Sequence, residues 1–509
     1  MSKMGEIMNR LTRTGLPVFI FIIMCFLSAC QKNPEKNVVV SKNDGTFDIY
    51  ATAPTQEESS QYAVSTQSIE RDFMSTDGSV QFSMSLDIEN LNEYVPVIEV
   101  TPHYLTSDDV QRVANVLFEG ADFKEAQILS SPSYGKEDIR QKIARWAPFA
   151  NNDALEVLFG SIPNGTSELV QEFINNYTSM YETASEGSYN VPCQWEFRKS
   201  SYYSFPKEIA DKRDTAAEND VISVELQYGD VYYKIDANRR DQNDFQQNTI
   251  SVYLYEGIGP DLIDERIFRA QLCRTDKPSA VQINAASEIA QMMLTKMELG
   301  DWVVDQQYVE TTYYGNIAEY IIHVTATPAF KGMSVVRQPQ LSNLRNADEY
   351  SSTYYLTDAH FQFSANGELV SFQLYSPVDI VETANENVAT LSLQEQIDYG
   401  RQFLVLSDRG TYGLTPDIIE SYEETFGEEV ICKIDICDYD YALTRIKIPD
   451  VDENYYYIPG LTLYGTIDYC GKDTGTVYGA SGETFGSSRM KTLVSINAIN
   501  GSIIESSSR

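Results

Sequence analysis

The stretch "DGSVQFSMSLDI", residues 77–88, decides the fold class. Its apolar side chains stand at every second position: Val80, Phe82, Met84, Leu86 and Ile88. The positions between them carry polar side chains. Strict alternation predicts a β-strand with one buried and one solvated face, entered from a turn at Asp77-Gly78. "VPVIEV", residues 95–100, predicts a second strand.

Helical periodicity begins directly afterwards, in "TSDDVQRVANVLFEG", residues 106–120. Thr106 is a typical N-cap, Asp108 and Asp109 fall in the first turn, and Gly120 ends the segment. The predicted buried stripe consists of Val110, Val113, Ala114 and Leu117. Further helices are predicted over about 136–147, 151–159, 166–183 and 281–299, with another that starts at Ser392 in a capping box with Glu395. The methionines Met293 and Met297 stand at core spacing and are interpreted as packing residues.

Hairpin turns mark the remaining chain. They are predicted at Gly229-Asp230, Gly315-Asn316, Asn366-Gly367 and Asn500-Gly501. At Asn500-Gly501 the dipeptide favours a type I′ turn, in which both residues take positive φ. The helices near 281 and at Ser392 are each followed by several strands, which suggests tandem helix-plus-meander units. We therefore predict an α+β fold of antiparallel β-meanders with helices packed on one face.

The N-terminus carries a targeting pattern. Lys3, Arg10 and Arg13 precede an apolar run from Leu16 to Leu27, which is shorter than the roughly 20 residues of a spanning helix. The residues Leu27, Ser28, Ala29 and Cys30 follow, and they resemble the bacterial lipobox. The resemblance implies cleavage before Cys30 and a diacylglycerol on its sulfur, hence a lipid anchor on the extracytoplasmic face of the cell membrane. An uncleaved anchor helix with a chance cysteine is the alternative.

These patterns divide the chain into four parts. Residues 1–29 are expected to form a lipoprotein signal peptide, and residues 30–66 the lipidated Cys30 and a disordered tether. Residues 67–275 are expected to form an N-terminal α+β domain. Residues 276–509 are expected to form a C-terminal α+β domain with two helix-plus-meander units.

The C-terminus carries a second resemblance. "NAINGSII", residues 497–504, resembles the terminal hairpin of PepSY-type domains. "YYYIPGLTLYG", residues 455–465, resembles a strand that precedes this hairpin in extracytoplasmic regulators of cell-wall sensor kinases. Together with the lipobox, the chain resembles an uncharacterised lipoprotein family of Gram-positive bacteria. That resemblance brings no catalytic residues, because the family has no assigned activity.

The net charge and the cysteine content limit which binding partners and which disulfide bonds are expected. The net charge of −36 repels nucleic acid, so none is expected as a partner. The cysteines after Cys30 are odd in number: Cys193, Cys273, Cys432, Cys437 and Cys470. Cys432 and Cys437 are five residues apart on one predicted strand and therefore face opposite sides. A bridge from Cys437 to Cys470 stays open, although buried or inert thiols are the preferred interpretation.

Catalytic and metal motifs are absent from the sequence. It lacks G-x-S-x-G, H-E-x-x-H, Walker A and G-x-G-x-x-G patterns, and its histidines are His103, His323 and His360. His323 and His360 are interpreted as ordinary strand residues that face solvent or a partly polar layer. "DVDEN", residues 450–454, starts like a calcium loop, but Tyr455 and Leu461 replace the required Gly and Glu. The many tyrosines are interpreted as packing residues, with sugar stacking as the alternative.

Three function classes remain. The preferred prediction is a non-enzymatic module that binds or regulates another envelope protein or a wall polymer, with no cofactor or metal. A transporter-linked solute-binding lipoprotein is the first alternative, although that class is built on βαβ units with parallel sheets. A wall-active hydrolase is the second, although no nucleophile or metal motif supports it.

Overall fold

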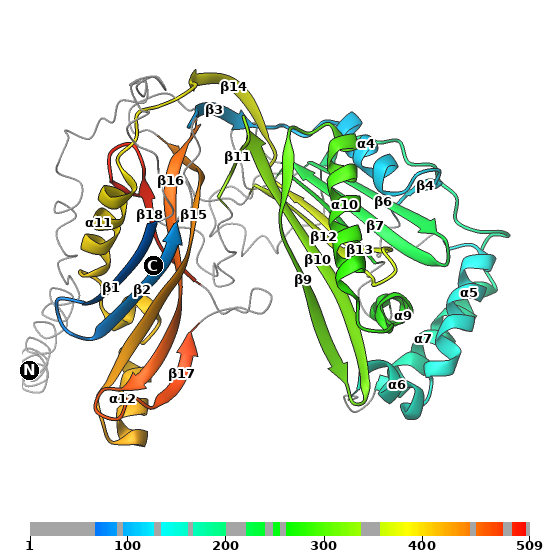
Figure 1. Ribbon diagram of the computed structural model, residues 1–509. Coiled ribbons are helices and arrows are strands. Elements are labelled where there is room, and N and C mark those ends of the chain that lie inside the picture. The colour runs from blue at the N-terminus through cyan, green and yellow to red at the C-terminus, as the bar shows by residue number, and fades with distance from the viewer. Residues whose placement is uncertain are drawn as a thin grey trace, which may run out of the picture.

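The computed structural model describes residues 67–88, 95–126, 134–160, 166–199, 220–239, 248–254, 261–336, 357–447, 455–481 and 491–504. The predicted signal peptide, lipobox and tether lie outside these described residues. Two sheets stand next to each other in the molecule (Figure 1).

The first sheet has nine strands in the described part of the chain. They are β1 (Gln67–Met74), β2 (Val80–Ile88), β3 (Val97–Pro102), β14 (Val378–Asn385), β15 (Val430–Lys447), β16 (Tyr455–Gly471), β17 (Val477–Ser481), β18 (Lys491–Asn497) and β19 (Ile503–Ile504). Its main path runs β1-β2-β15-β16-β18-β19. β2 and β15 pair in parallel, and the other pairings of this sheet are antiparallel.

The second sheet has ten strands in the same described ranges. They are β4 (Phe123–Glu125), β5 (Arg198–Lys199), β6 (Asp220–Tyr228), β7 (Val231–Arg239), β8 (Thr249–Leu254), β9 (Trp302–Tyr314), β10 (Ile317–Phe330), β11 (Met333–Ser334), β12 (Asp358–Phe363) and β13 (Leu369–Tyr375). All its strand pairings are antiparallel.

Helices cover these sheets. They are α4 (Ser107–Leu117), α5 (Lys136–Trp146), α6 (Asn152–Phe159), α7 (Thr166–Tyr181), α9 (Asp261–Cys273), α10 (Ala280–Met297), α11 (Leu393–Leu404) and α12 (Pro416–Phe426), with the 3-10 turns η1 (Ala147–Phe149) and η4 (Arg409–Tyr412). The buried side chains of α4, α9 and α10 share one hydrophobic core with the second sheet. α11 and η4 pack on the first sheet, and α5 to α7 share a core of their own. The predicted α+β class with antiparallel sheets is confirmed.

The pairing of strands departs from the predicted division at residue 275. β1 to β3, from the start of the described chain, join the first sheet together with β14 to β19. β8 pairs with β13, so the second sheet contains strands from both sides of residue 275. The second sheet is therefore inserted into the chain of the first. Periodicity identifies strands but does not specify partners that are distant in sequence.

Local predictions agree with the structure. In β2 the predicted apolar positions are the buried ones, and Gly78 takes a positive φ of 74° in the turn before it. In α4, Thr106 accepts from the backbone N–H of Asp109 in a capping box, and the four predicted stripe residues are buried. The helices predicted at 136–147, 151–159, 166–183, 281–299 and Ser392 are all present, whereas α9 and α12 were not predicted.

The last hairpin differs from its predicted turn. Among the described residues, positive φ occurs at Gly501 but not at Asn500, so the turn is not type I′. The N–H of Asn497 bonds to the carbonyl of Ser502 at 2.8 Å, and the N–H of Gly501 bonds to the carbonyl of Asn497 at 2.8 Å. The connection is therefore a four-residue loop, residues 498–501, whose last residue, Gly501, takes the left-handed conformation.

An apolar cluster joins the two sheets. It combines Val95, Ile98 and Val100 near β3 with Phe330, Met333, Val335, Leu443 and Tyr457. The N–H of Val336 donates to the carbonyl of Leu443 at 2.8 Å. The two sheets are thus joined by packed side chains as well as by the two chain segments that link them, from β3 to α4 and from β13 to β14.

Candidate functional site

The sequence-predicted site residues, Leu27, Ser28, Ala29 and Cys30, lie outside the described residues, so the lipobox stays a prediction. Within the described ranges, every helix falls short of the length and apolarity that crossing a bilayer requires. In the same ranges, no three His, Cys, Asp or Glu side chains are grouped as ligands of a metal ion would be.

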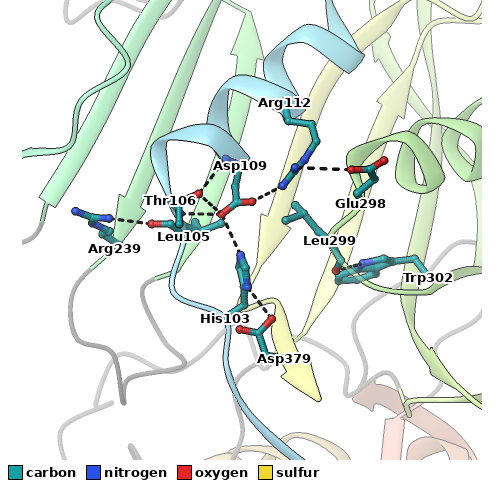
Figure 2. A network of polar contacts seen from close by, with 10 residues as sticks. All are labelled: His103, Leu105, Thr106, Asp109, Arg112, Arg239, Glu298, Leu299, Trp302 and Asp379. Carbon is teal, nitrogen blue, oxygen red and sulfur yellow. Dashed lines mark hydrogen bonds and ion pairs between the residues drawn. The ribbon is translucent and has the colours of Figure 1, made fainter. Parts of the chain in front are cut away.

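His103 lies where the chain passes from the first sheet to the second (Figure 2). Its Nδ1 is 2.8 Å from Oδ1 of Asp379 on β14, and its Nε2 is 3.1 Å from Oδ2 of Asp109 on α4. Its backbone N–H also donates to the carbonyl of Pro377, on the returning connection, at 2.8 Å. The imidazole therefore ties the outgoing chain to the returning chain.

Charge explains why this contact holds. Hydrogen bonds first to Asp109 and then to Asp379 raise the pKa of His103 to about 9, so the imidazole is a cation at neutral pH. Burial alone would raise the pKa of Asp109, but hydrogen bonds from His103 and Thr106 outweigh burial and lower it. Arg112 also binds Asp109 and lies 3.8 Å from Glu298 at the end of α10 (Figure 2).

This contact predicts a pH dependence. Because the folded pKa of His103 is raised above its ordinary 6.5, its stabilisation is fully present below pH 6.5 and is lost as the pH rises through about 9. We expect the melting temperature of wild type to exceed that of His103→Gln most at the acid end of this range, with the difference shrinking toward the alkaline end. Thermal unfolding at several pH values measures this. A difference that does not change with pH would contradict the assignment.

His323 and His360 form a second cluster, on β10 and β12. Nδ1 of His323 is 3.0 Å from Nε2 of His360, and Nε2 of His323 is 2.8 Å from Oε2 of Glu310. Tyr308 stacks on the His323 ring with centroids 4.5 Å apart. His323 is buried, so it belongs to a polar layer rather than to solvent. The sequence indicates on which face of its strand each histidine lies, but it does not indicate which strands pair. This cluster could therefore be predicted only in part.

Asp440 on β15 is a third perturbed group. Burial, with the nearby charges of Asp305 and Asp438, raises the pKa of Asp440 to about 6. Asp305 belongs to β9 of the second sheet, so like charges of the two sheets approach each other here. Bringing these like charges together disfavours the ionised form of Asp440.

The described cysteines are all free thiols. Cys432 is buried and Cys437 is exposed, as their predicted opposite faces require, and the open alternative of a bridge from Cys437 to Cys470 is not formed. Burial raises the pKa of Cys273 and of Cys432 to about 12. A thiolate, not a thiol, is the nucleophile, so these two side chains are unreactive at neutral pH.

The first sheet carries a hollow of about 580 Å³ on four neighbouring strands. Alternation directs Val80 and Phe82 of β2 into the core that contains α11, so Gln81 and Ser83 lie on the opposite face. A first row of side chains crosses the sheet there. It runs from Met74 to Gln81, Lys433 and Asp468.

A second row lies two residues along each strand. It runs from Asp72 to Ser83, Asp435 and Thr466. Side chains directly opposite each other on neighbouring strands stand about 4.5–5.5 Å apart at Cβ. The hollow is therefore lined by a grid of side chains fixed by β1, β2, β15 and β16.

The charged groups of this grid have no partners in the described part of the chain. Lys433 lies directly opposite Asp468, yet neither forms an ion pair or a hydrogen bond with a described residue. The same holds for Asp72 and Asp435, which are exposed. Among the described residues these four groups are unpaired, which distinguishes the hollow from the two histidine clusters.

No family model matches the chain, and no curated protein matches it. It is similar in structure to an uncharacterized protein from Eubacterium rectale at 11% identity and a TM-score of 0.34, over 86% of this chain and 94% of that one. It is also similar to the C-terminal domain of Bacillus megaterium YpeB at 10% identity and a TM-score of 0.23, over 56% and 87%.

Proposed function

We propose that the protein is a lipid-anchored, extracytoplasmic binding module of the cell envelope that acts without catalysing a reaction. The observation that carries this proposal is the hollow on the first sheet, where Lys433, Asp435 and Asp468 have no ion-pair partner among the described residues and stand on a four-stranded platform. Rigid elements position binding groups better than loops do. The lipobox resemblance supplies the compartment, and the resemblance to PepSY-bearing Gram-positive lipoproteins is part of the same proposal.

The alternatives have less support. A transporter-linked solute-binding lipoprotein is expected to use βαβ units and parallel sheets. Among the described strands, the pairing of β2 with β15 is parallel and the other pairings are antiparallel. A wall hydrolase needs a reactive nucleophile, an acid–base pair at a cleft or a metal. The described thiols with pKa values of about 12 do not supply a nucleophile.

The anchor is tested at Cys30. We expect Cys30→Ala to abolish incorporation of labelled fatty acid and to release the protein from the membrane fraction, because the thiol is the acceptor of the lipid. Metabolic labelling followed by fractionation measures both effects.

Cys25→Ala is the matched control, since it removes a thiol from the apolar run and leaves the lipobox intact. The control is expected to label like wild type. Equal labelling of Cys30→Ala and wild type would reject the anchor.

A further inference from the structure

We infer that the hollow on the first sheet binds an amino acid or short peptide that carries two or three ammonium groups and one carboxylate. This inference rests on the proposed binding function and names its ligand class. Asp72, Asp435 and Asp468 supply three carboxylates around the hollow, and Lys433 supplies one ammonium. A ligand that complements these four groups carries both positive and negative charges, with the positive charges in excess.

Lys433 favours a ligand that carries a carboxylate. It stands between Gln81 on β2 and Asp468 on β16, in the interior of the grid. A polyamine without a carboxylate would bring further positive charge toward the Lys433 ammonium and would leave this ammonium without an ion-pair partner among the described residues. A carboxylate at this position instead pairs with Lys433, while Gln81 can donate a further hydrogen bond.

Two ammonium groups have separate places. Asp468 lies in the first row, and Asp72 and Asp435 lie in the second row, two strands apart with Ser83 of β2 between them. One ammonium can therefore approach Asp468 while the other approaches the second row. The spacing suits a diamino acid or a lysine-containing dipeptide better than a small inorganic cation.

Met74 supplies the remaining surface. Its side chain is 49% exposed although it ends the first row of the grid. The aliphatic part of a lysine side chain can lie against this thioether, which adapts readily to irregular contacts. Below it, Phe73 and Phe82 stack with centroids 4.7 Å apart, which keeps this end of the hollow rigid.

The experiment is a calorimetric titration of the full-length protein in detergent with four probes. They are L-lysyl-L-lysine, L-lysine, cadaverine and L-glutamate. We expect lysyl-lysine to bind most tightly, cadaverine to bind more weakly than lysine, and glutamate to be rejected. Binding should weaken with added salt, because exposed charge contacts are screened.

Variants identify the site. Asp435→Asn combined with Asp468→Asn should lower the affinity for lysyl-lysine by about tenfold, since two partly exposed charge contacts are lost. Lys433→Gln should abolish the preference for lysine over cadaverine. Asp87→Asn is the matched control, because Asp87 is exposed on β2 but does not line the hollow, and it should bind like wild type.

Two outcomes overturn the inference. One is the absence of lysyl-lysine binding, and the other is binding that the double variant leaves unchanged. Neither affects the anchoring test at Cys30, so a wrong ligand class is distinguishable from a wrong compartment.

Discussion

Glu319→Ala is expected to lower the free energy of unfolding by about 3–5 kcal/mol, because it removes a buried carboxylate that pairs with a cluster of arginines. The Glu319 side chain is 0% exposed. Arg266 donates to its two oxygens at 2.9 and 2.8 Å, Arg274 donates at 2.9 Å, and Nε of Arg269 lies 3.5 Å away. Without Glu319, three guanidinium groups repel one another in a poorly solvated site.

The cluster also fixes the arrangement of three elements. Arg266 and Arg274 lie on or just after α9, Glu319 lies on β10, and both arginines donate to the carbonyl of Leu158 at the end of α6. The Arg266 guanidinium further lies 3.9 Å from the centroid of the Tyr314 ring. Loss of Glu319 is therefore expected to loosen α6 and α9 together.

The measurement is denaturant-induced unfolding of Glu319→Ala beside Glu386→Ala. Glu386 pairs with Lys331 at 2.7 Å, but the two side chains are 80% and 43% exposed. Exposed ion pairs contribute little to stability, so the control should stay close to wild type. Equal stability of the two variants would show that the buried cluster does not hold these elements together.

Local structure was predictable from the sequence where one segment contains all the information. The alternation in β2 and the capping box at Thr106 each depend on residues within about one turn or one strand. Even there, α9 was missed. Its arginines pair with Glu319, with Arg266 buried and Arg269 half-buried, and a pattern based on apolar residues does not identify such a face.

The candidate site was not predictable, because it depends on pairing between distant segments. Gln81 and Lys433 are neighbours only because β2 pairs in parallel with β15. His103 and Asp379 are 276 residues apart, and His323 and His360 meet through the register of β10 and β12. Periodicity gives the face of each residue, whereas register and partner strand come from tertiary packing.

Gly501→Val is expected to cost about 2–6 kcal/mol, the sum of about 1–3 for backbone strain and about 1–3 for overpacking. Gly501 has φ of 75°, which a β-branched residue adopts only under strain. A Cβ there would also stand 2.3 Å from a ring carbon of Tyr399 on α11. Either the ring or the terminal loop must move, and α11 packs against β18 and β19.

Two further variants separate these causes. Gly120→Val places the same side chain at φ of 79°, where a Cβ would meet no atom within 4 Å, so it should show the backbone strain alone. Tyr399→Ala removes the ring, and Gly501→Val should cost less in that background by the overpacking part. Thermal unfolding of the four proteins and wild type measures both differences. If Gly501→Val and Gly120→Val melt together, the ring of Tyr399 does not constrain the terminal hairpin. If they differ and Tyr399→Ala abolishes the difference, the ring of Tyr399 on α11 constrains the loop before the last strand, and the conformation of Gly501 is coupled to the core of the first sheet.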